Sequence, residues 1–457
     1  MSYYSRLAKV WRKRGVLIFL FSVNFGSHHS KQFVMNHRLI LFAFVSVFFA
    51  SCSFSQKSDN CTHFRGSNMD GHAQVEKAPL HWSDSTNIEW KVPVKGLGWS
   101  SPVVFGDQIW MTSAAKDGKE FYTLCYDFKT GKLLDEKTIF MAEDPQRIHG
   151  TNSYATPTPC IEEGFVYVHY GNFGTACINT NNFEVVWKRE DMPCDHMQGP
   201  ASSLILHKNR LIVHLEGTED PYVAALDKKT GETIWKSVRP KEIYDLLEPV
   251  FRKSYQTPIV IEVKGKEQLI SNSAFMCFAH DVNTGEVIWT VEYGFDSTVS
   301  QPLYWDGLVY VNSGWIFVDN VPFFTRQYAI DPTGKGDVTK THVKWMYEDE
   351  VPQIPTPVIV DGKMYMVHDR GMVTCLDAKT AQVIWKHELN GNFNSSPVYA
   401  AGNIYFFNVK GECTIIKPGE TFQLVTENNI DETVKAVPVF VNDKMVLRTE
   451  KFLYLIK

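Results

Sequence analysis

Residues 225–235 read ALDKKTGETIW, and this phrase decides the fold. The alternating apolar residues before Asp227 predict a strand. The Asp-x-x-Thr-Gly that follows predicts a tight turn, because Asp can bond to the backbone further along and Gly accepts a positive φ. The residues that end in Trp235 predict a second strand. Further copies stand at 279–289 (AHDVNTGEVIW), 375–385 (CLDAKTAQVIW), 125–135 (CYDFKTGKLLD, without Trp) and, more weakly, 177–187 (CINTNNFEVVW).

A second phrase starts each repeat. It has a small residue and Pro, alternating apolar residues, a Gly or Asn turn, and another apolar strand, as in PTPVIVDGKMYMV at 355–367. Its Pro or an equivalent residue stands at 102, 159, 204, 258, 302, 357, 397 and 438, with spacings of 40 to 57. The two phrases predict eight units of four short antiparallel strands. Such a unit cannot bury its faces alone, but radial stacking into a propeller buries them.

The two ends of the repeat region predict how the ring closes. The last repeat starts at Val437 and the chain stops at Lys457, which leaves room for about three strands. Residues 88–94, IEWKVPV, carry a Trp strand with no repeat start before it. We therefore predict an all-β fold over residues 64–457, an eight-bladed β-propeller whose N-terminal strand completes the last blade. The alternative, an open array of eight blades, would leave exposed strand edges.

The N-terminal residues predict export rather than a folded domain. From Met35 the chain reads MNHRLILFAFVSVFFASC, a basic start followed by an apolar run too short to span a membrane comfortably. Residues 49–52 resemble a bacterial lipobox, which implies cleavage before Cys52 and lipidation of its thiol. A plain cleaved signal is the alternative. Ser53 follows the cysteine, and by analogy with Gram-negative lipoproteins this favours the outer membrane.

These segments give the domain organisation. We interpret 1–34 as an upstream extension from an early start, 35–51 as the lipoprotein signal and 52–63 as a linker. The alternative is a signal anchor built on the apolar patch at 16–23. The interpretation predicts an exported outer-membrane lipoprotein that faces the periplasm or the cell surface, with the lipid anchor as its only membrane attachment.

The charge of the mature body excludes some partners. The whole chain has 46 basic and 51 acidic residues, and residues 1–51 hold seven of the basic ones and none of the acidic ones. The remainder has 39 basic and 51 acidic residues, a net charge of about −12. A body this acidic is not expected to bind nucleic acid or, unaided, anionic lipid.

The cysteines after Cys52 are expected to be mostly structural. Three of them occupy the same position in different repeats, two residues before the turn Asp or Asn, and two lie two residues earlier on the same face. Equivalent positions in separate blades are too far apart for a disulfide, so we predict that these five are buried and act as small apolar residues. These are Cys125, Cys177, Cys277, Cys375 and Cys413. The states of Cys61, Cys160 and Cys194 stay open.

The Asp-x-x-Thr-Gly-x-x-x-Trp phrase resembles the repeat of the pyrroloquinoline-quinone (PQQ) type propellers. That superfamily includes the quinoprotein alcohol dehydrogenases and the outer-membrane assembly lipoprotein BamB. Further stretches resemble a branch of exported bacterial lipoproteins with no settled biochemical role: FRG at 64–66, NSYATPTP at 152–159, GDVTKTHVKW at 336–345 and the closing LRTEKFLYLI. The resemblance covers about residues 64–457 and implies the fold, whereas a shared fold says little about activity.

The resemblance to the dehydrogenases implies features that this chain lacks. Those enzymes have an adjacent Cys-Cys disulfide at the quinone, a Ca²⁺ ion held by Glu, Asn and Asp, a catalytic Asp and often a haem-binding Cys-x-x-Cys-His segment. The sequence contains no adjacent cysteine pair and no Cys-x-x-Cys-His. We therefore expect no cofactor, PQQ included.

Loops at one rim of the propeller are expected to form a ligand site, because loops on a rigid scaffold commonly carry function. Two loop sets share this rim, those that lead into each innermost strand and those that join second and third strands. The candidates are His149, Asn152, Tyr154, His196, Gln198, Glu216, Asp220, Tyr255, Arg326, Asp369 and Arg370.

Several chemistries are possible at this rim. His149, His196 and Glu216 or Asp220 could hold a metal, but no close metal-ligand spacing supports this, so we expect none. The residues favour a polar pocket for a peptide, glycan or small anion, with Arg326 and Arg370 able to clamp a carboxylate. The apolar loop at 312–326 is expected either to plug the pore or to dock on a partner.

The sequence thus favours a non-catalytic, envelope-anchored binding or scaffold protein, comparable in kind to BamB, with an envelope protein, peptide or glycan as partner. The alternative is an exported enzyme with its site at the channel mouth, either quinone-dependent or active on carbohydrates.

Overall fold

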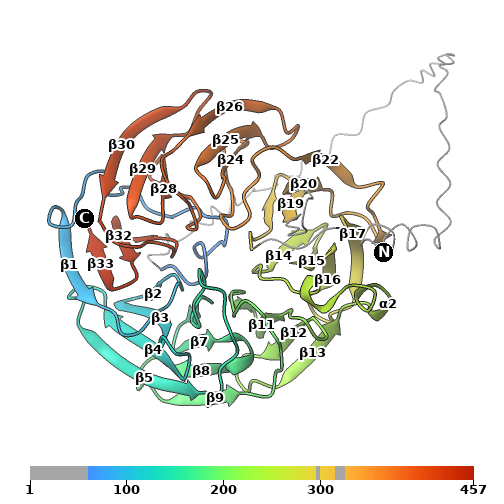
Figure 1. Ribbon diagram of the computed structural model, residues 1–457, viewed down its shortest axis with the longest axis horizontal. Helices are drawn as coiled ribbons and strands as arrows, with labels where there is room; N and C mark the ends of the chain where they lie inside the picture. Colours follow the sequence, from blue (N-terminus) through green and yellow to red (C-terminus); the bar gives the residue numbers. More distant parts are fainter. Residues whose placement is uncertain (1–59, 295–298, 314–324) are drawn as a thin grey trace, which may run out of the picture. The chain divides into compact units, whose positions relative to one another are not determined.

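The computed structural model describes residues 60–294, 299–313 and 325–457. These residues form a ring of eight blades around a central channel, as predicted (Figure 1). The predicted signal segment, Cys52 and most of the apolar loop at 312–326 lie outside the described residues.

Each of the first four blades consists of four consecutive strands, numbered from the channel outward. Blade 1 has β2 (Val103–Phe105), β3 (Gln108–Ala114), β4 (Glu120–Asp127) and β5 (Leu133–Met141). Blade 2 has β6 (Cys160–Glu162), β7 (Phe165–His169), β8 (Thr175–Asn179) and β9 (Val185–Arg189). Blade 3 has β10 (Ile205–His207), β11 (Arg210–Leu215), β12 (Tyr222–Asp227) and β13 (Thr233–Val238). Blade 4 has β14 (Ile259–Val263), β15 (Lys266–Asn272), β16 (Met276–Asp281) and β17 (Val287–Glu292), and β21 (Gly336–Asp337) adds to its edge in parallel.

The remaining blades follow the same plan. Blade 5 has β18 (Leu303–Trp305), β19 (Leu308–Ser313), β20 (Arg326–Ile330) and β22 (Val343–Tyr347). Blade 6 has β23 (Val358–Val360), β24 (Lys363–Val367), β25 (Met372–Asp377) and β26 (Val383–Glu388). Blade 7 has β27 (Val398–Ala400), β28 (Asn403–Phe407), β29 (Glu412–Lys417) and β30 (Gln423–Asn429). Blade 8 has β31 (Val439–Val441), β32 (Lys444–Arg448), β33 (Phe452–Ile456) and, outermost, β1 (Ile88–Pro93).

Blade 8 confirms the predicted closure. β1 pairs antiparallel with β33, with Lys91 opposite Tyr454 and Pro93 opposite Phe452. A strand from the start of the fold therefore ties together the two ends of the ring.

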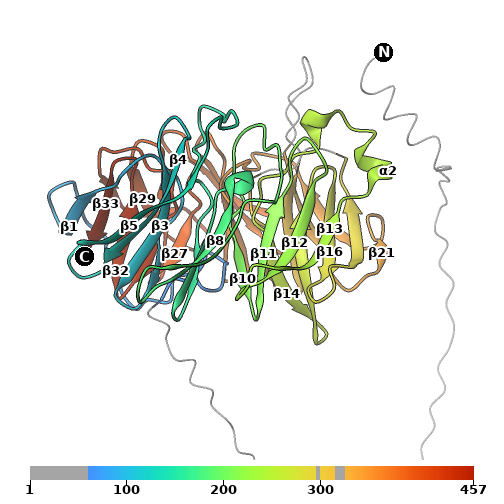
Figure 2. The ribbon, with the colours of Figure 1, turned by 90° about the horizontal axis from the view of Figure 1, so that it is seen from below.

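Three short helical segments interrupt the strands: η1 (Gly171–Phe173) joins β7 to β8 within blade 2, and α2 (Lys241–Tyr244) and η2 (Pro249–Phe251) lie between blades 3 and 4. Seen edge on, the strands of neighbouring blades stand side by side and α2 lies at the periphery (Figure 2). No helix in the described part of the chain is long and apolar enough to span a membrane.

The Trp phrase is explained by contacts between blades. In the copy at residues 225–235, Asp227 Oδ1 accepts the backbone N–H groups of Lys229 and Thr230, which shapes the turn between β12 and β13. Trp187 of blade 2 donates its indole N–H to the carbonyl of Lys228 in that turn at 3.0 Å. Gly231 has φ +77°, and a Cβ there would come within 2.7 Å of the Trp187 ring. The Gly therefore serves both the turn and the docked indole.

The same docking recurs around the ring. The Trp of an outer strand donates to a carbonyl in the β-turn of the next blade in five cases. These are Trp90 to Phe128, Trp187 to Lys228, Trp235 to Val282, Trp345 to Ala378 and Trp385 to Gly419, all at 3.0–3.1 Å. Trp289 of blade 4 departs from this pattern and donates to Gln268 of its own blade at 2.9 Å.

The apolar core lies between neighbouring blades. One cluster, for example, joins Ile270 and Trp289 of blade 4 to Val309 and Ile330 of blade 5. The eight described cysteines are all buried and free of disulfides, which confirms the prediction for Cys125, Cys177, Cys277, Cys375 and Cys413. Cys61, Cys160 and Cys194, whose state the sequence left open, are buried thiols too.

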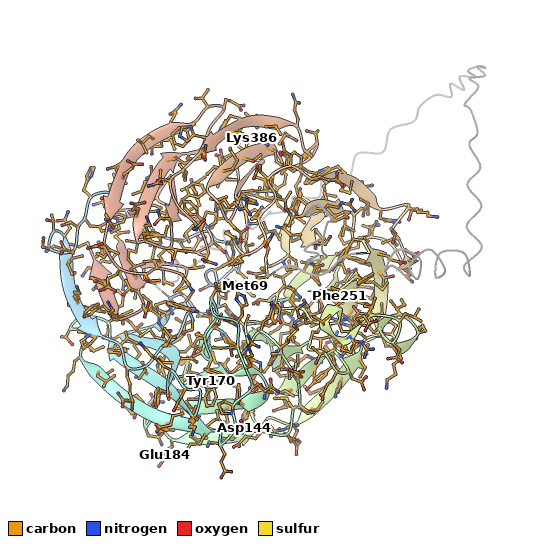
Figure 3. The ribbon with its side chains drawn as sticks, in the orientation of Figure 1. Met69, Asp144, Tyr170, Glu184, Phe251 and Lys386 are labelled. Atoms are coloured by element: carbon orange, nitrogen blue, oxygen red, sulfur yellow. The ribbon has the colours of Figure 1, made fainter. Side chains whose placement is uncertain are left out.

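A segment before β1 crosses the channel. Cys61 pairs with Val104 of blade 1, His63 Nε2 accepts the backbone N–H of Leu206 in blade 3, and the Arg65 guanidinium donates to Thr356 and Pro357 carbonyls beside blade 6. Met69 of this segment lies near the centre of the ring (Figure 3). The fold therefore begins before residue 64, and the segment lies across the channel in contact with the innermost strands.

Candidate functional site

A cavity of about 360 Å³ occupies the channel mouth. The loops that lead into the innermost strands of all eight blades contribute to its wall, and Phe64 of the crossing segment lines it as well. Its size is that of a small-molecule pocket. We call it the channel-mouth cavity.

The repeat itself builds this cavity. Two positions of each repeat line the wall: the residue directly before the repeat Pro (the later position) and the residue three before that Pro (the earlier position). Blade 5 contributes only the earlier position. Alternate residues of an extended segment face the same side, so this spacing aims both side chains at the channel. The earlier positions are Trp99, Thr156, Ala201, Tyr255, Val299, Ile354, Asn394 and Lys435.

Hydroxyl groups at the later position fasten neighbouring blades together. Ser101 donates its backbone N–H to Thr158 Oγ1 at 2.9 Å, and Thr158 donates in the same way to Ser203 Oγ at 3.0 Å. Equivalent bonds run from Ser203 to Thr257, from Gln301 to Thr356, from Thr356 to Ser396 and from Val437 to Ser101. We call the six acceptors the hydroxyl ring: Ser101, Thr158, Ser203, Thr257, Thr356 and Ser396.

Four of the residues predicted from the sequence line the cavity: His149, Asn152, Gln198 and Tyr255. Their loops are tied to one another. Asn152 Nδ2 donates to the Gln198 carbonyl at 2.8 Å, and the His149 backbone N–H donates to the same oxygen at 3.1 Å. Tyr255 donates its hydroxyl to the His196 carbonyl at 2.6 Å. The leading loops of blades 2, 3 and 4 are therefore held in one fixed arrangement.

Two further candidates lie near these loops but pack inward. The Tyr154 ring contacts Phe121 and Phe173, and its hydroxyl donates to the Gln146 carbonyl. His196 is 4% exposed, and its Nε2 accepts the Asn172 backbone N–H at 3.3 Å. Burial lowers the pKa of His196 to about 4. Both residues support the wall from behind and do not line it.

The expectation of a rim carboxylate at Glu216 is corrected by the structure. Glu216 is fully buried and forms an ion pair with Arg239 at 2.5 Å, and His214 Nε2 lies 3.1 Å from its Oε1. Burial alone would raise the pKa of this carboxyl, but Arg239 and His214 outweigh it and the net shift is downward. Glu216 therefore holds blades together and does not reach the cavity.

The remaining candidates are scattered. Asp220 is exposed and pairs with Lys241 at 3.4 Å, whereas Arg326 pairs with Glu348 at 2.6 Å. Arg370 lies exposed in the turn after β24. Asp369 supports the wall indirectly, since its carboxylate accepts the backbone N–H groups of Gln353 and Ile354, which line the cavity. The structure does not bring Arg326 and Arg370 to the cavity wall.

Sequence reasoning missed the most charged part of the wall. Lys435 and Lys253 line the cavity, and so does Trp99. Lys435 Nζ donates to the Thr151 carbonyl at 2.8 Å and stands 4.5 Å from the Trp99 ring centroid. Trp99, Tyr255 and Lys435 all stand two residues before a hydroxyl-ring position or its equivalent. Tyr255 was among the predicted residues, and counting back two residues from each repeat start would also have found Trp99 and Lys435.

The described residues do not fit the quinone and calcium site of the dehydrogenases. Residues 60–294, 299–313 and 325–457 contain no group of three His, Cys, Asp or Glu side chains placed to hold a metal. No described carboxylate lines the cavity, so the Glu and Asp ligands implied for Ca²⁺ have no counterpart there. His149, His196, Glu216 and Asp220 are accordingly not gathered around one point.

Comparison with known proteins identifies the family. The family model described as outer membrane protein assembly factor BamB matches residues 75–237 and 219–450, most of the described ring. The chain belongs to the BamB family. The BamB of Yersinia pestis is 22% identical over 271 residues, which cover 49% of this chain and 66% of that protein.

Curated relatives also include enzymes. The tetrathionate hydrolase of Acidithiobacillus ferrooxidans is 22% identical over 272 residues, 56% of this chain and 50% of that protein. That of Acidianus ambivalens is 26% identical over 143 residues, 27% of each chain. These matches span from about a quarter to two thirds of the relatives' length.

Solved structures agree on the fold. BamB from Moraxella catarrhalis has a TM-score of 0.55 at 12% identity and covers 80% of this chain and 96% of that one. The quinohemoprotein alcohol dehydrogenase ADHIIG from Pseudomonas putida HK5 has a TM-score of 0.60 at 10% identity, covering 88% and 80%. At such identities the likeness shows the propeller fold and leaves the activity of this BamB-family chain unassigned.

Proposed function

We propose that this chain is a non-catalytic, envelope-anchored binding or scaffold protein whose ligand or partner occupies the channel-mouth cavity. The observation that carries the proposal is the construction of the cavity. Loops of all eight blades converge on it, and Phe64 contributes to its wall from the crossing segment. Sites of this kind are largely preformed, so little ordering is needed when the ligand binds.

The described wall offers little for covalent or acid–base chemistry. His149 is the only imidazole in the described lining, and its Nδ1 is bonded to Thr151 Oγ1 at 2.8 Å. No carboxylate among the described lining residues is placed to orient it as a catalytic base. Cys194 stands 3.5 Å from His196 Nδ1, but His196 Nε2 accepts a backbone N–H, so Nδ1 carries the proton and cannot accept one from the thiol. This supports binding over catalysis.

The envelope location rests on the N-terminal sequence. Cys52 follows a short export signal, and membership of the BamB family favours an exported protein. We expect Cys52→Ala to prevent lipidation and to move the protein from the membrane to the soluble fraction. The measurement is fractionation with radiolabelled lipid, and Cys61→Ala is the matched control. A Cys52→Ala variant that still sediments with membranes would instead favour an anchor at residues 16–23.

The binding role is tested by filling the cavity. Ala201 lines it with a small side chain, so Ala201→Trp should occupy part of the space and abolish capture of an envelope protein, peptide or glycan from a cell extract. Lys229→Trp places the same indole on an exposed turn and is the control. The fold is checked by circular dichroism. Equal capture by Ala201→Trp and wild type would move the interaction to the outer edges of the blades.

A second candidate is hydrolysis of a sulfur oxyanion. The likeness to two tetrathionate hydrolases favours it, although the matches cover at most half of those proteins. Loss of tetrathionate over time in the presence of purified protein, absent with Ala201→Trp, would replace the binding proposal with an enzyme. No loss above the rate in buffer would leave the binding role in place.

A further inference from the structure

The wall of the channel-mouth cavity has a charge opposite to that of the protein. Its described residues include Lys253 and Lys435 but no Asp or Glu. The chain after residue 51 nevertheless has 51 acidic and 39 basic residues. Acidic side chains are thus absent from the described lining of this cavity, to which all eight blades contribute. A cation-lined cleft in an acidic body concentrates anions.

Lys435 is the most informative of these charges. Its ammonium is bonded to the Thr151 carbonyl and lies over the Trp99 ring, and no carboxylate lies within ion-pair distance among the described residues. The side chain is half-buried, and burial lowers the pKa of its ammonium, an effect that Glu450 only partly offsets. A half-buried cation without an anionic partner is costly, which is expected where a ligand supplies the partner.

The hydroxyl ring presents donors to the same space. Each of its six side chains is at most 6% exposed, lines the cavity and accepts a backbone N–H from a neighbouring blade. No described residue accepts the hydrogen of any of these hydroxyl groups. The backbone N–H uses one of the two lone pairs of each oxygen, so each hydroxyl can still donate its hydrogen to a ligand and keeps one lone pair.

Two more hydrogen-bond donors, on His149 and Trp99, come from the loops next to Lys435. His149 Nδ1 accepts the Thr151 backbone N–H at 3.3 Å, so in the neutral ring Nε2 carries the proton. The indole N–H of Trp99 is buried and has no hydrogen-bond partner among the described residues. Lys435, Trp99 and His149 come from the leading loops of blades 8, 1 and 2, and Lys435 and His149 both contact Thr151.

We infer that the channel-mouth cavity binds a small oxyanion, a molecule that carries carboxylate, sulfonate, sulfate or phosphate groups, with Lys435 as its principal counter-ion. The inference deepens the proposed function and rests on it. A ligand that the cavity accepts would place its anionic oxygens against Lys435, Trp99 and His149. The hydroxyl ring would then donate to its remaining oxygens. A neutral polyol would find these donors but would leave the ammonium unpaired.

Isothermal titration calorimetry of the purified full chain tests the inference. The probes are sodium sulfate, sodium tetrathionate and sodium succinate, each at an ionic strength held constant with sodium chloride, and glucose as the neutral probe. We expect at least one anion to bind and glucose not to. Lys435→Gln keeps a donor for the Thr151 carbonyl but removes the charge, and it should weaken anion binding about tenfold or more. Lys229→Gln, the same change on an exposed turn, should have no effect.

Three results would overturn the inference. They are an unchanged Kd in Lys435→Gln, an equal Kd for glucose, and no heat from any anion up to high millimolar concentration. The proposed function fails separately. If Ala201→Trp abolishes partner capture while no anion binds, the cavity is a binding site for another ligand class. If anions bind but nothing is captured, the oxyanion site stands without a partner.

Discussion

Two polar clusters, one in the strands and loops of blades 3 and 4 and one at the channel-mouth cavity, differ in how their charges are satisfied. In the first, which we call the blade-3/4 cluster, Glu216, Arg239, His214, His280, Ser271 and Ser273 are all buried and bonded to one another. In the channel-mouth cavity, the Lys435 ammonium has no described carboxylate beside it. A charge that is paired inside the protein holds blades together, whereas an unpaired one at a cavity is available to a ligand.

The largest expected effect is at the blade-3/4 cluster. Glu216→Ala leaves Arg239 buried without its carboxylate, so the free energy of unfolding should fall by about 3–5 kcal/mol. Denaturant unfolding monitored by tryptophan fluorescence measures it. The double variant Glu216→Leu with Arg239→Met removes both charges and should recover most of the loss. A loss below about 1 kcal/mol in Glu216→Ala would show that the cluster does not hold the blades.

The buried imidazoles predict how stability depends on pH. Burial lowers the pKa of His196 to about 4, and those of His169 and His280 to about 3. The unfolded chain takes up these protons near pH 6.5, so the stability they contribute is complete above pH 6.5 and is lost as the pH falls towards 4. Each imidazole contributes up to about 1.4 kcal/mol per pH unit in this window.

Unfolding curves recorded from pH 7.5 to 4.5 check this slope. His280 Nε2 accepts from the Arg239 guanidinium at 3.0 Å, so it must be neutral in the fold. His280→Gln keeps an acceptor but cannot be protonated, and its slope should be shallower than that of the wild type. If stability fell with pH equally steeply in His280→Gln and in the wild type, protonation of His280 would not contribute to the pH dependence.

A smaller effect on stability is expected at the hydrogen bond that joins Tyr255 of the cavity wall to the loop of His196 behind it. Tyr255 lines the cavity and donates its hydroxyl to the His196 carbonyl at 2.6 Å. Tyr255→Phe removes this bond and keeps the ring, so it should cost about 1 kcal/mol. Thermal unfolding measures it, with Tyr304→Phe as a matched control, since the Tyr304 hydroxyl forms an exposed bond at 3.3 Å. Equal shifts in both variants would contradict a supporting role for this bond.

The smallest effect is expected at the unpaired charge. Lys435→Gln should change the free energy of unfolding by no more than about 0.5 kcal/mol, or raise it slightly, because the fold itself disfavours this ammonium. Chemical denaturation in low-phosphate, low-sulfate buffer measures it. A loss as large as that of Glu216→Ala would erase the difference between the two clusters and make Lys435 a structural residue.

Much of the fold could be predicted from local patterns. One phrase recurs because each copy builds the same kind of turn and docking site, as Asp227, Thr230, Gly231 and Trp187 show. The Trp-containing strand at 88–94, which has no repeat start before it, becomes β1 and closes the ring as predicted. The crossing segment at residues 61–73 could not be foreseen, because it contacts the inner strands of distant blades and carries no repeat pattern of its own.

The candidate site was predicted only in part. His149, Asn152, Gln198 and Tyr255 were found because their loops precede repeat starts. Glu216 was chosen from the other loop set, which joins second and third strands, yet its side chain turns into the blade interface, where Arg239 neutralises it. Lys435 was missed because a lysine in a short polar loop resembles any solvated surface charge.

The sequence by itself determined the number of blades, the chemistry of their turns and the strand that closes the ring, since these depend on contacts within a repeat or on the match between the two chain ends. Only the tertiary structure decided which polar groups meet. Lys435 and Thr151 are 284 residues apart and lie within 2.8 Å. Such pairs form because the propeller brings the leading loops of all blades to one axis, a geometry that no local pattern encodes. Glu216 is paired with Arg239 inside the protein, whereas no described carboxylate pairs with Lys435, and that difference distinguishes a structural charge from one available to a ligand.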